Sequence, residues 1–144
     1  MLVSQILKSK SDDGVVTVVP GTTVAQTAEI LSTRRIGAVI VSSDGKRVAG
    51  IVSERDIVRE IGRRGMACMA DAVDSIMTAN IVTCRRDEQA NDVLQKMTDG
   101  RFRHMPVMEG AEMVGLISIG DVVKARLTEL AMEKDALEGM IKGF

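Results

Sequence analysis

The chain has 144 residues, of which 45% are hydrophobic and none is Trp or Tyr, and its formal net charge is −1. This length suits one compact domain or two small halves that share a core, and the near-zero charge gives no electrostatic basis for binding nucleic acid. Because no apolar run reaches the roughly 20 residues of a membrane helix and no signal-peptide segment begins the chain, we expect a cytoplasmic protein that does not bind membranes.

The first half of the chain predicts, in order, an arm or short helix at 2–7, a strand at 15–19, a helix from 24, strands at 38–41 and 48–52, and a helix from 54. Thr23 begins the first of the long helices in a capping-box pattern, and the Asp44-Gly45 pair is a strong hairpin signal between the two later strands. Ser53 is expected to cap the next helix, and Gly62 and Gly65 are expected to end it.

The second half predicts the same order, with a strand at 81–84, a helix capped by Asp87, strands at 105–108 and 113–117, and a last helix from 119 to about 141. Apolar residues of the last helix follow heptad spacing, with Lys134 at the one missing position; they are Val123, Leu127, Leu130, Leu137 and Ile141. A helix this long outruns its own sheet, so it is either a solvated tail or a seam for a second subunit. We favour the seam and predict a homodimer.

The most informative pattern is a repeat, because the segment GIVSERDIV at 50–58 returns 65 positions later as GLISIGDVV at 115–123. Further matches, at offsets of 66, 67 and 70, pair 16–18 with 82–84, 36–41 with 103–108, and 3–7 with 73–77. They divide the chain into a first repeat with its arm at 1–64, a linker at 65–72, a second repeat at 73–128 and a helical extension at 129–144. One repeat alone would bury little apolar surface, so the two are expected to pack sheet to sheet.

The repeated unit, with its G-I-V-S-x-x-D and x-H-M-P-V segments, resembles a pair of cystathionine-β-synthase (CBS) domains, also called a Bateman module. The resemblance covers roughly residues 3–127, and we expect a small stand-alone module. It implies an α/β (α+β) fold of two β-α-β-β-α repeats related by a pseudo-two-fold axis. It also implies adenine-nucleotide binding in clefts between the halves, with AMP as the leading ligand and ADP, ATP, NADH or S-adenosylmethionine as alternatives. Modules of this family commonly pair into a disc.

Within such a module, each strand-to-helix corner suits a nucleotide. A carboxylate in the first turn of a helix, as at Asp56 and Asp121, can accept hydrogen bonds from both ribose hydroxyls. Ser53 and Ser118 carry hydroxyls near a helix N-terminus, where backbone N–H groups favour phosphate. Arg55 could neutralise phosphate charge, whereas the second copy has a glycine there. The alternative is that each Ser-x-x-Asp is only a helix cap.

Further candidates come from the starts of the repeated strands. In the family, backbone groups at the start of the second strand bond the adenine edge and apolar side chains enclose the ring. Gly37 would allow close approach, and Pro106 fixes the strand entry. The hydroxyls of Thr17 and Thr83 could bond adenine or phosphate, although threonine also simply favours strands. The adenine-edge candidates are Ile36, Gly37, Ala38, Arg103, His104, Met105 and Pro106.

Basic residues gather just before the second of these strands. Arg101, Arg103 and His104 lie within four positions of one another, so they form either an anion-binding group beside the phosphate or a solvated loop with a structural histidine. Arg34 and Arg35 lie at a similar place in the first copy and could support the other cleft.

The sequence predicts a regulatory protein rather than an enzyme. His104 is the only histidine, no P-loop or G-x-G-x-x-G is present, and Cys68 and Cys84 lack zinc-ligand spacing, so we expect reduced thiols and no metal. We therefore predict an adenine-nucleotide sensor whose dimer geometry changes with ligand. The alternatives are a partner-regulating interaction protein, for example of redox or metabolic enzymes, in which nucleotide is secondary, and an enzyme such as a nucleotide hydrolase.

Overall fold

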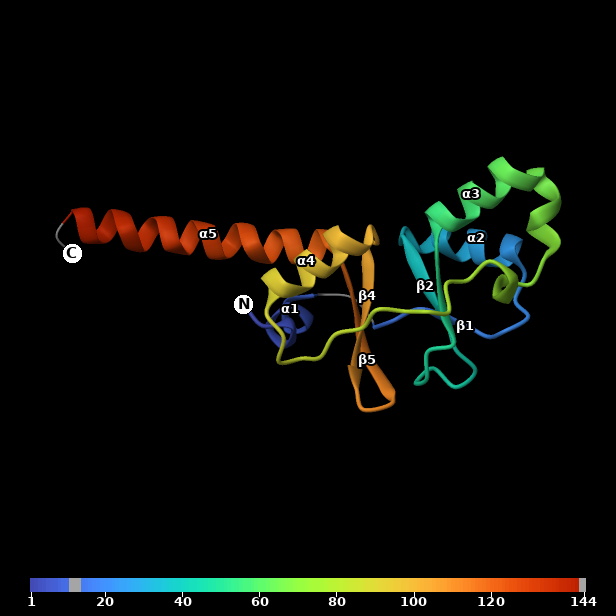
Figure 1. The fold of residues 1–144 in the computed structure, drawn as a ribbon, viewed down its shortest axis with the longest axis horizontal. Coiled ribbons are helices and arrows are strands. Elements are labelled where there is room, and N and C mark those ends of the chain that lie inside the picture. Colours follow the sequence, from blue (N-terminus) through green and yellow to red (C-terminus); the bar gives the residue numbers. More distant parts are fainter. Residues whose placement is uncertain (11–13, 143–144) are drawn as a thin grey trace. The chain divides into compact units, whose positions relative to one another are not determined.

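The computed structural model describes residues 1–10 and 14–142, and they form two compact units. Unit 1 holds residues 1–10, 83–108 and 115–142, and unit 2 holds residues 14–82 and 109–114. The elements in chain order are α1 (Val3–Ser9), β1 (Thr17–Val18), α2 (Val24–Arg34), β2 (Ala38–Val41), β3 (Gly50–Ser53), α3 (Glu54–Arg64), η1 (Gly65–Ala70), η2 (Val73–Ser75), α4 (Ala90–Gly100), β4 (His104–Glu109), β5 (Glu112–Ser118) and α5 (Ile119–Ile141) (Figure 1).

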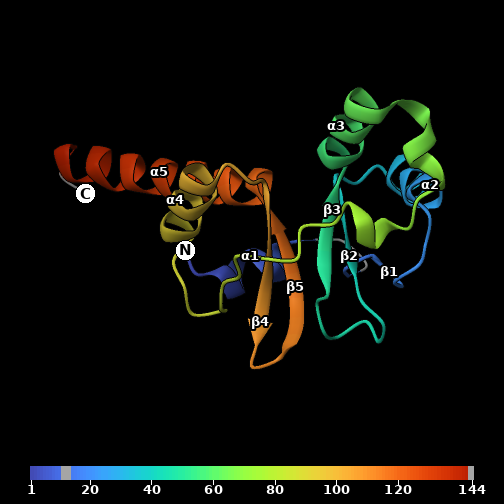
Figure 2. The same ribbon diagram turned by 45° about the vertical axis from the view of Figure 1, so that its right-hand side comes forward.

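Unit 2 is built on a three-stranded sheet in the order β1-β2-β3. β1 pairs with β2 in parallel, and β2 pairs with β3 antiparallel, with Ala38 opposite Ser53. β3 runs directly into α3 (Figure 2), so the end of this strand is also the start of the helix. The sheet and helices bury a β-branched and aliphatic core made of Val18, Val24, Leu31, Val39, Val41, Val52, Ile57 and Val73.

Unit 1 is built on the β4-β5 hairpin, whose tip at 109–114 belongs to unit 2. α4 packs along α5, and α1 contacts α5. The strand predicted at 81–84 is wrong: only Cys84 forms a bridge, parallel to Val107. Of residues 81–84 only Cys84 is buried, so burial does not favour strand pairing at the other three positions. Thr83 therefore does not lie in a strand.

Most of the predicted helix starts are confirmed, but two predicted boundaries are wrong. Thr23 caps α2 in a complete capping box with Gln26. Asp87 does not cap α4; that helix begins after Gln89, and the exposed Asp87 pairs with Arg85 instead. Gly62 lies inside α3, which ends at Gly65 (φ 74°), because only Gly65 takes the positive φ that a glycine tolerates without a Cβ penalty.

The N-terminal arm packs on elements of the second repeat, although the sequence groups it with the first. Leu2 forms an antiparallel bridge with Gln89, and the amide of Val3 donates to the carbonyl of Glu88 at 2.9 Å. Leu7 of α1 lies so close over Gly115 that a methyl group there would meet its Cδ2 atom at 2.7 Å.

The segment that matches this arm packs on the first repeat in the same way. Ala72 forms an antiparallel bridge with Thr23, and the side chain of Met77 covers Gly50 as Leu7 covers Gly115. Each compact unit therefore combines the body of one repeat with the short leading segment of the other, which is why the units do not follow the repeat boundaries.

Across the described ranges 1–10 and 14–142, no helix combines the length and apolar character that crossing a membrane requires.

Candidate functional site

The first corner, where β3 meets α3, is a capping box with an added ion pair. The hydroxyl of Ser53 accepts from the amide of Asp56 at 3.2 Å. Asp56 Oδ2 accepts in return from the Ser53 amide at 2.8 Å and from its hydroxyl at 3.1 Å, and Oδ1 accepts from Arg59 at 2.8 Å. The prediction that this motif caps a helix is therefore confirmed. Both carboxylate oxygens accept hydrogen bonds, and the Arg59 side chain, 64% exposed, is the more exposed member of the ion pair.

The second corner, where β5 meets α5, repeats the cap with a different cation. The hydroxyl of Ser118 accepts from the Asp121 amide at 3.2 Å, and Asp121 Oδ2 accepts from the Ser118 amide at 2.8 Å. The same Oδ2 pairs at 2.9 Å with Lys10, which also donates to the carbonyl of Leu116 at 2.8 Å. The second carboxylate is thus tied to the N-terminal arm, while the first is tied to its own helix.

The electrostatics of Asp121 follow from these contacts. Burial alone raises the pKa of the Asp121 carboxyl, but the hydrogen bond from the Ser118 amide and the ion pair with Lys10 outweigh burial and hold this pKa below its usual value. The carboxyl is therefore ionised at neutral pH and can accept hydrogen bonds. The sequence analysis missed Lys10, because no spacing or motif links it to a carboxylate 111 positions away.

Backbone hydrogen bonds join each corner to the start of a neighbouring strand. The carbonyl of Gly37 accepts from the amide of Glu54 at 2.9 Å, and the carbonyl of Arg103 accepts from the amide of Ile119 at 2.8 Å. In each unit the candidate adenine-edge backbone therefore lies directly beside the Ser-Asp corner.

These bonds also correct the alignment of the repeats. Gly37 corresponds to Arg103 and Ala38 to His104, at an offset of 66 rather than 67. Ile36 then corresponds to Phe102, which the sequence analysis did not include among the candidates.

An arginine in the left-handed conformation precedes each of these strands. Arg35 (φ 53°) ends α2 and Arg101 (φ 56°) ends α4, and their amides donate to the carbonyls of Leu31 and Met97. Only these two non-glycine residues among those described have positive φ. An L-residue pays a steric cost in this conformation, so both copies keep a strained arginine at the same place.

The other candidates differ in exposure. Thr17, Ile36, Gly37 and His104 are half-buried, and Thr83 lies in coil. Ala38, Met105 and Pro106 are buried, and the carbonyl of Pro106 accepts from the amide of Cys84 at 3.0 Å. The exposed candidates are Arg55, Thr83, Arg101 and Arg103. Backbone hydrogen bonds to Glu54 and Ile119, the first residues of α3 and α5, bring Gly37 beside Ser53 and Asp56, and Arg103 beside Ser118 and Asp121.

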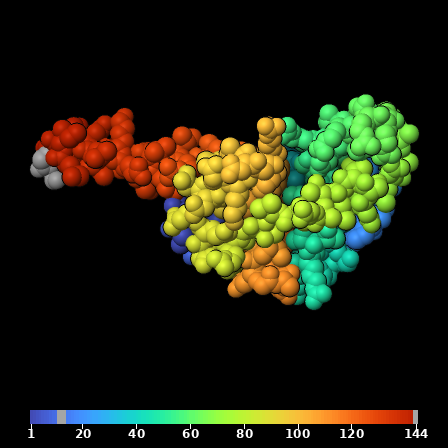
Figure 3. All heavy atoms as spheres, viewed as in Figure 1, coloured from blue at the N-terminus to red at the C-terminus, as the bar shows by residue number. Residues whose placement is uncertain are grey.

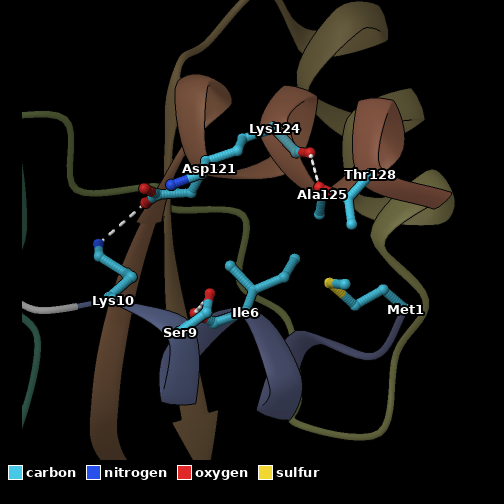
Figure 4. Close-up of a pocket in the computed structure, with 8 residues that line it drawn as sticks. All are labelled: Met1, Ile6, Ser9, Lys10, Asp121, Lys124, Ala125 and Thr128. Carbon is cyan, nitrogen blue, oxygen red and sulfur yellow. Dashed lines mark hydrogen bonds and ion pairs between the residues drawn. The ribbon is translucent and has the colours of Figure 1, made fainter. Parts of the chain in front are cut away.

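A pocket of about 430 Å³ lies between α1 and α5 in unit 1 (Figure 4). The ion pair of Lys10 with Asp121 borders it, and the amines of Lys10 and Lys124 give it cationic walls. Such a lining suits an anionic group next to the carboxylate. The lining residues are Met1, Ile6, Ser9, Lys10, Asp121, Lys124, Ala125 and Thr128.

Within residues 1–10 and 14–142, no three His, Cys, Asp or Glu side chains gather as a metal site would require. Cys68 and Cys84 are both buried free thiols. Burial raises the pKa of the Cys84 thiol to about 12, which leaves it protonated and unreactive at neutral pH.

The family model for the CBS domain matches this chain twice, at residues 3–63 and 73–128. The chain belongs to the CBS-domain family. It is a CBS pair, and the resemblance inferred from the two Ser-Asp corners is confirmed.

Known proteins similar to this CBS pair support the assignment. A CBS-domain containing protein from Agrobacterium tumefaciens has 41% identity and a TM-score of 0.83, with 88% of this chain and 99% of that chain covered. The mitochondrial CBS domain-containing protein CBSX3 of Arabidopsis thaliana is 32% identical over 98% of this chain and 72% of its own length. A CBS domain protein from Pyrobaculum aerophilum, solved in complex with AMP, has 26% identity and a TM-score of 0.77, covering 92% and 99% of the two chains. The mixed α+β fold class with a long last helix is thereby confirmed.

Proposed function

We propose that this CBS pair is a regulatory module that binds an adenosine-containing ligand, with AMP first and ADP, ATP or NADH as alternatives. The duplicated Ser-Asp corner carries the proposal: both copies hold a carboxylate in the first turn of a helix, oriented by the same capping box. The Pyrobaculum aerophilum relative solved with AMP supports adenosine as the recognised group.

Each corner residue has a part in this proposal. Asp56 and Asp121 accept the ribose hydroxyls, because an ionised carboxylate supplies two acceptor oxygens for a vicinal diol. The exposed Arg55 contributes charge for phosphate at the first corner, while Lys10 is the nearest cation at the second. At the first corner Arg59 must leave Oδ1 of the buried Asp56 before a ribose hydroxyl can take its place.

The two corners are therefore proposed to bind with unequal affinity. At the second corner, the Ser118 amide and Lys10 both contact Oδ2 of Asp121, so we take Oδ1 as the oxygen that accepts from the ligand. At the first, a diol competes with Arg59.

Regulation follows from differential affinity rather than from catalysis. A nucleotide that binds one arrangement of a dimer more tightly than another shifts the population toward that arrangement. The proposed clefts would each contribute one carboxylate, whereas hydrolysis by acid–base chemistry needs paired groups with separated pKa values. Binding is thus the function that these residues support best.

Thermal melting of the purified protein with AMP, ADP, ATP, NADH and S-adenosylmethionine in turn tests the proposal. A ligand at 100 times its dissociation constant adds about 2.7 kcal/mol of stability, which shifts the melting temperature clearly. We expect a shift with AMP that shrinks in Asp121→Asn and in Asp56→Asn and vanishes in the double variant. Asp135→Asn, an exposed position on α5, is the matched control.

Nucleotide carried over from expression is first removed by unfolding and refolding, and its removal is checked by the ultraviolet spectrum. If the emptied protein melts identically with every nucleotide, the sensor proposal fails and a partner-regulating role takes its place. Conversion of labelled ATP to product would overturn the assignment as a non-catalytic module.

A further inference from the structure

The last helix carries an apolar face that its own unit does not cover. Within unit 1, α5 buries only Val122 and Ala125, while Val123 is 40%, Leu127 63%, Leu130 47%, Leu137 59% and Ile141 85% exposed. The exposed residues recur at spacings of four and three, so they form one stripe along the helix. We call Val123, Leu127, Leu130, Lys134, Leu137 and Ile141 the α5 stripe.

The α5 stripe lies on the side of the helix away from the rest of unit 1. Val122 and Ala125 face inward, and Glu129 on the same side pairs with the N-terminal amine at 2.6 Å. Past this contact the helix stands clear of α1 and α4 (Figures 1 and 3). Because most helical stability in proteins comes from packing of an amphipathic face, a partner packed on the α5 stripe would stabilise this part of the helix.

We propose that the partner is α5 of a second copy, packed antiparallel along the stripe. In the register that places Ala131 beside Ala131 of the second copy on the flank of the seam, Leu127 faces Leu137 of the second copy and Leu130 faces Lys134. The outermost layer joins Val123 to Ile141. The inference deepens the homodimer part of the proposed function by naming the surface and the direction.

The charges beside the stripe favour this direction. Lys124 and Glu138 occupy the same flank of the heptad, and the antiparallel register places Lys124 of each copy opposite Glu138 of the other. Two attractive pairs result. The register also brings the two Glu133 side chains together at the centre, beside Lys134, which pairs with Glu138 of its own helix at 3.8 Å.

A parallel pairing of the same stripe is disfavoured by repulsion. It would place Lys134 opposite Lys134 of the second copy in the apolar seam. It would also place Glu133 of each copy opposite Glu138 of the other, because flanking positions five residues apart meet in parallel coiled coils. No attractive pair offsets these contacts.

Charge reversal tests the surface. Sedimentation equilibrium should show a dimer for the wild type. Lys124→Glu and Glu138→Lys should each raise the dimer dissociation constant by about tenfold, because each turns two attractive pairs into two repulsive ones. The double variant K124E/E138K should restore wild-type affinity, whereas Asp135→Lys, outside the seam, should change it little. Circular dichroism checks that every variant stays folded.

Engineered cysteines test the direction. Under mild oxidation Ala131→Cys should form a disulfide-linked dimer, because the proposed register brings this position opposite itself. Lys134→Cys should not, since position 134 meets itself only in a parallel pair. The wild type is the background control, because Cys68 and Cys84 are buried.

A monomeric wild type, a double variant no better than the single ones, or cross-linking through position 134 would each overturn the proposal. Nucleotide-induced melting shifts are measured separately, so a failed dimer does not count against the ligand site.

Discussion

At the scale of single residues, one motif caps a helix and is also the proposed ligand contact. In Ser53-Asp56 and Ser118-Asp121 the serine hydroxyl accepts a backbone amide of the first helical turn, and the carboxylate accepts the serine amide. These bonds fix the carboxylate before any ligand arrives. The two interpretations that the sequence left open are therefore compatible, because the cap provides the orientation that binding needs.

The lowered pKa of Asp121 predicts a pH-dependent contribution to stability. Because the folded-state pKa lies below the reference value of 3.8, the ionised carboxylate stabilises the fold above that value, and this contribution is lost as the pH falls through the folded-state pKa. At neutral pH, Asp121→Asn should cost about 1 kcal/mol of unfolding free energy, the typical size of a lost cap contact.

Urea denaturation of the wild type and of Asp121→Asn, at neutral pH and in strong acid, measures the difference between their unfolding free energies. This difference should disappear in acid. Asp135→Asn, whose carboxylate is exposed, should show only a small gap. A gap for Asp121→Asn that stays constant across the pH range would mean that its carboxylate contributes nothing through its charge.

At the scale of elements, the same packing device appears once in each unit. In each unit a short segment places one side chain over a glycine of the strand that leads into the Ser-Asp corner: Leu7 lies over Gly115 in β5, and Met77 lies over Gly50 in β3. The match between 3–7 and 73–77 in the sequence thus has a structural reason, because both segments fill equivalent places.

This packing predicts that alanine at Gly50 and alanine at Gly115 lower the unfolding free energy by different amounts. The added methyl of Gly50→Ala overlaps Met77 along its side chain and comes within 3.1 Å of its Cβ, whereas that of Gly115→Ala meets chiefly the outer methyl groups of Leu7. Gly50→Ala should therefore lower the unfolding free energy by about 1–3 kcal/mol, and Gly115→Ala by less. Chemical denaturation measures both.

Gly62→Ala is the control, because the space around this exposed helical glycine is open. It should raise stability by up to about 1 kcal/mol through helix propensity. Adding Met77→Ala to Gly50→Ala should recover part of the loss, since the overlap disappears. If Gly50→Ala and Gly115→Ala lowered the unfolding free energy equally, Met77 and Leu7 would move aside equally easily.

At the scale of the whole molecule, the exposed half of α5 predicts a separation between folding and association. A chain ending after Glu129 keeps Val122, Ala125 and the pairing of Glu129 with the N-terminal amine, and removes most of the α5 stripe. We expect it to fold as a monomer. The melting temperature of the full chain should rise between about 1 and 100 µM protein, as for any dimer, and that of the shortened chain should stay constant.

Differential scanning calorimetry at several concentrations makes this comparison. A shortened chain that no longer unfolds cooperatively would place residues 130–141 in the core of unit 1. A concentration-dependent melting temperature that survives the truncation would move the dimer contact elsewhere on the chain.

The sequence alone determined the features that arise from local patterns. The repeat identified the family, the capping boxes located the starts of α2, α3 and α5, and the Asp44-Gly45 turn predicted the β2-β3 hairpin. The end of α5 at Ile141 also followed from periodicity. These features depend on neighbours within one or two helical turns, so a single sequence contains the information.

Only the tertiary structure decided the features that join distant segments. It placed α1 on the second repeat, paired Lys10 with Asp121, reduced the strand at 81–84 to one bridge, and shifted the alignment at Gly37 by one residue. Each of these depends on packing between residues far apart in the chain, where burial and hydrogen-bond geometry choose among partners that the local sequence leaves equivalent.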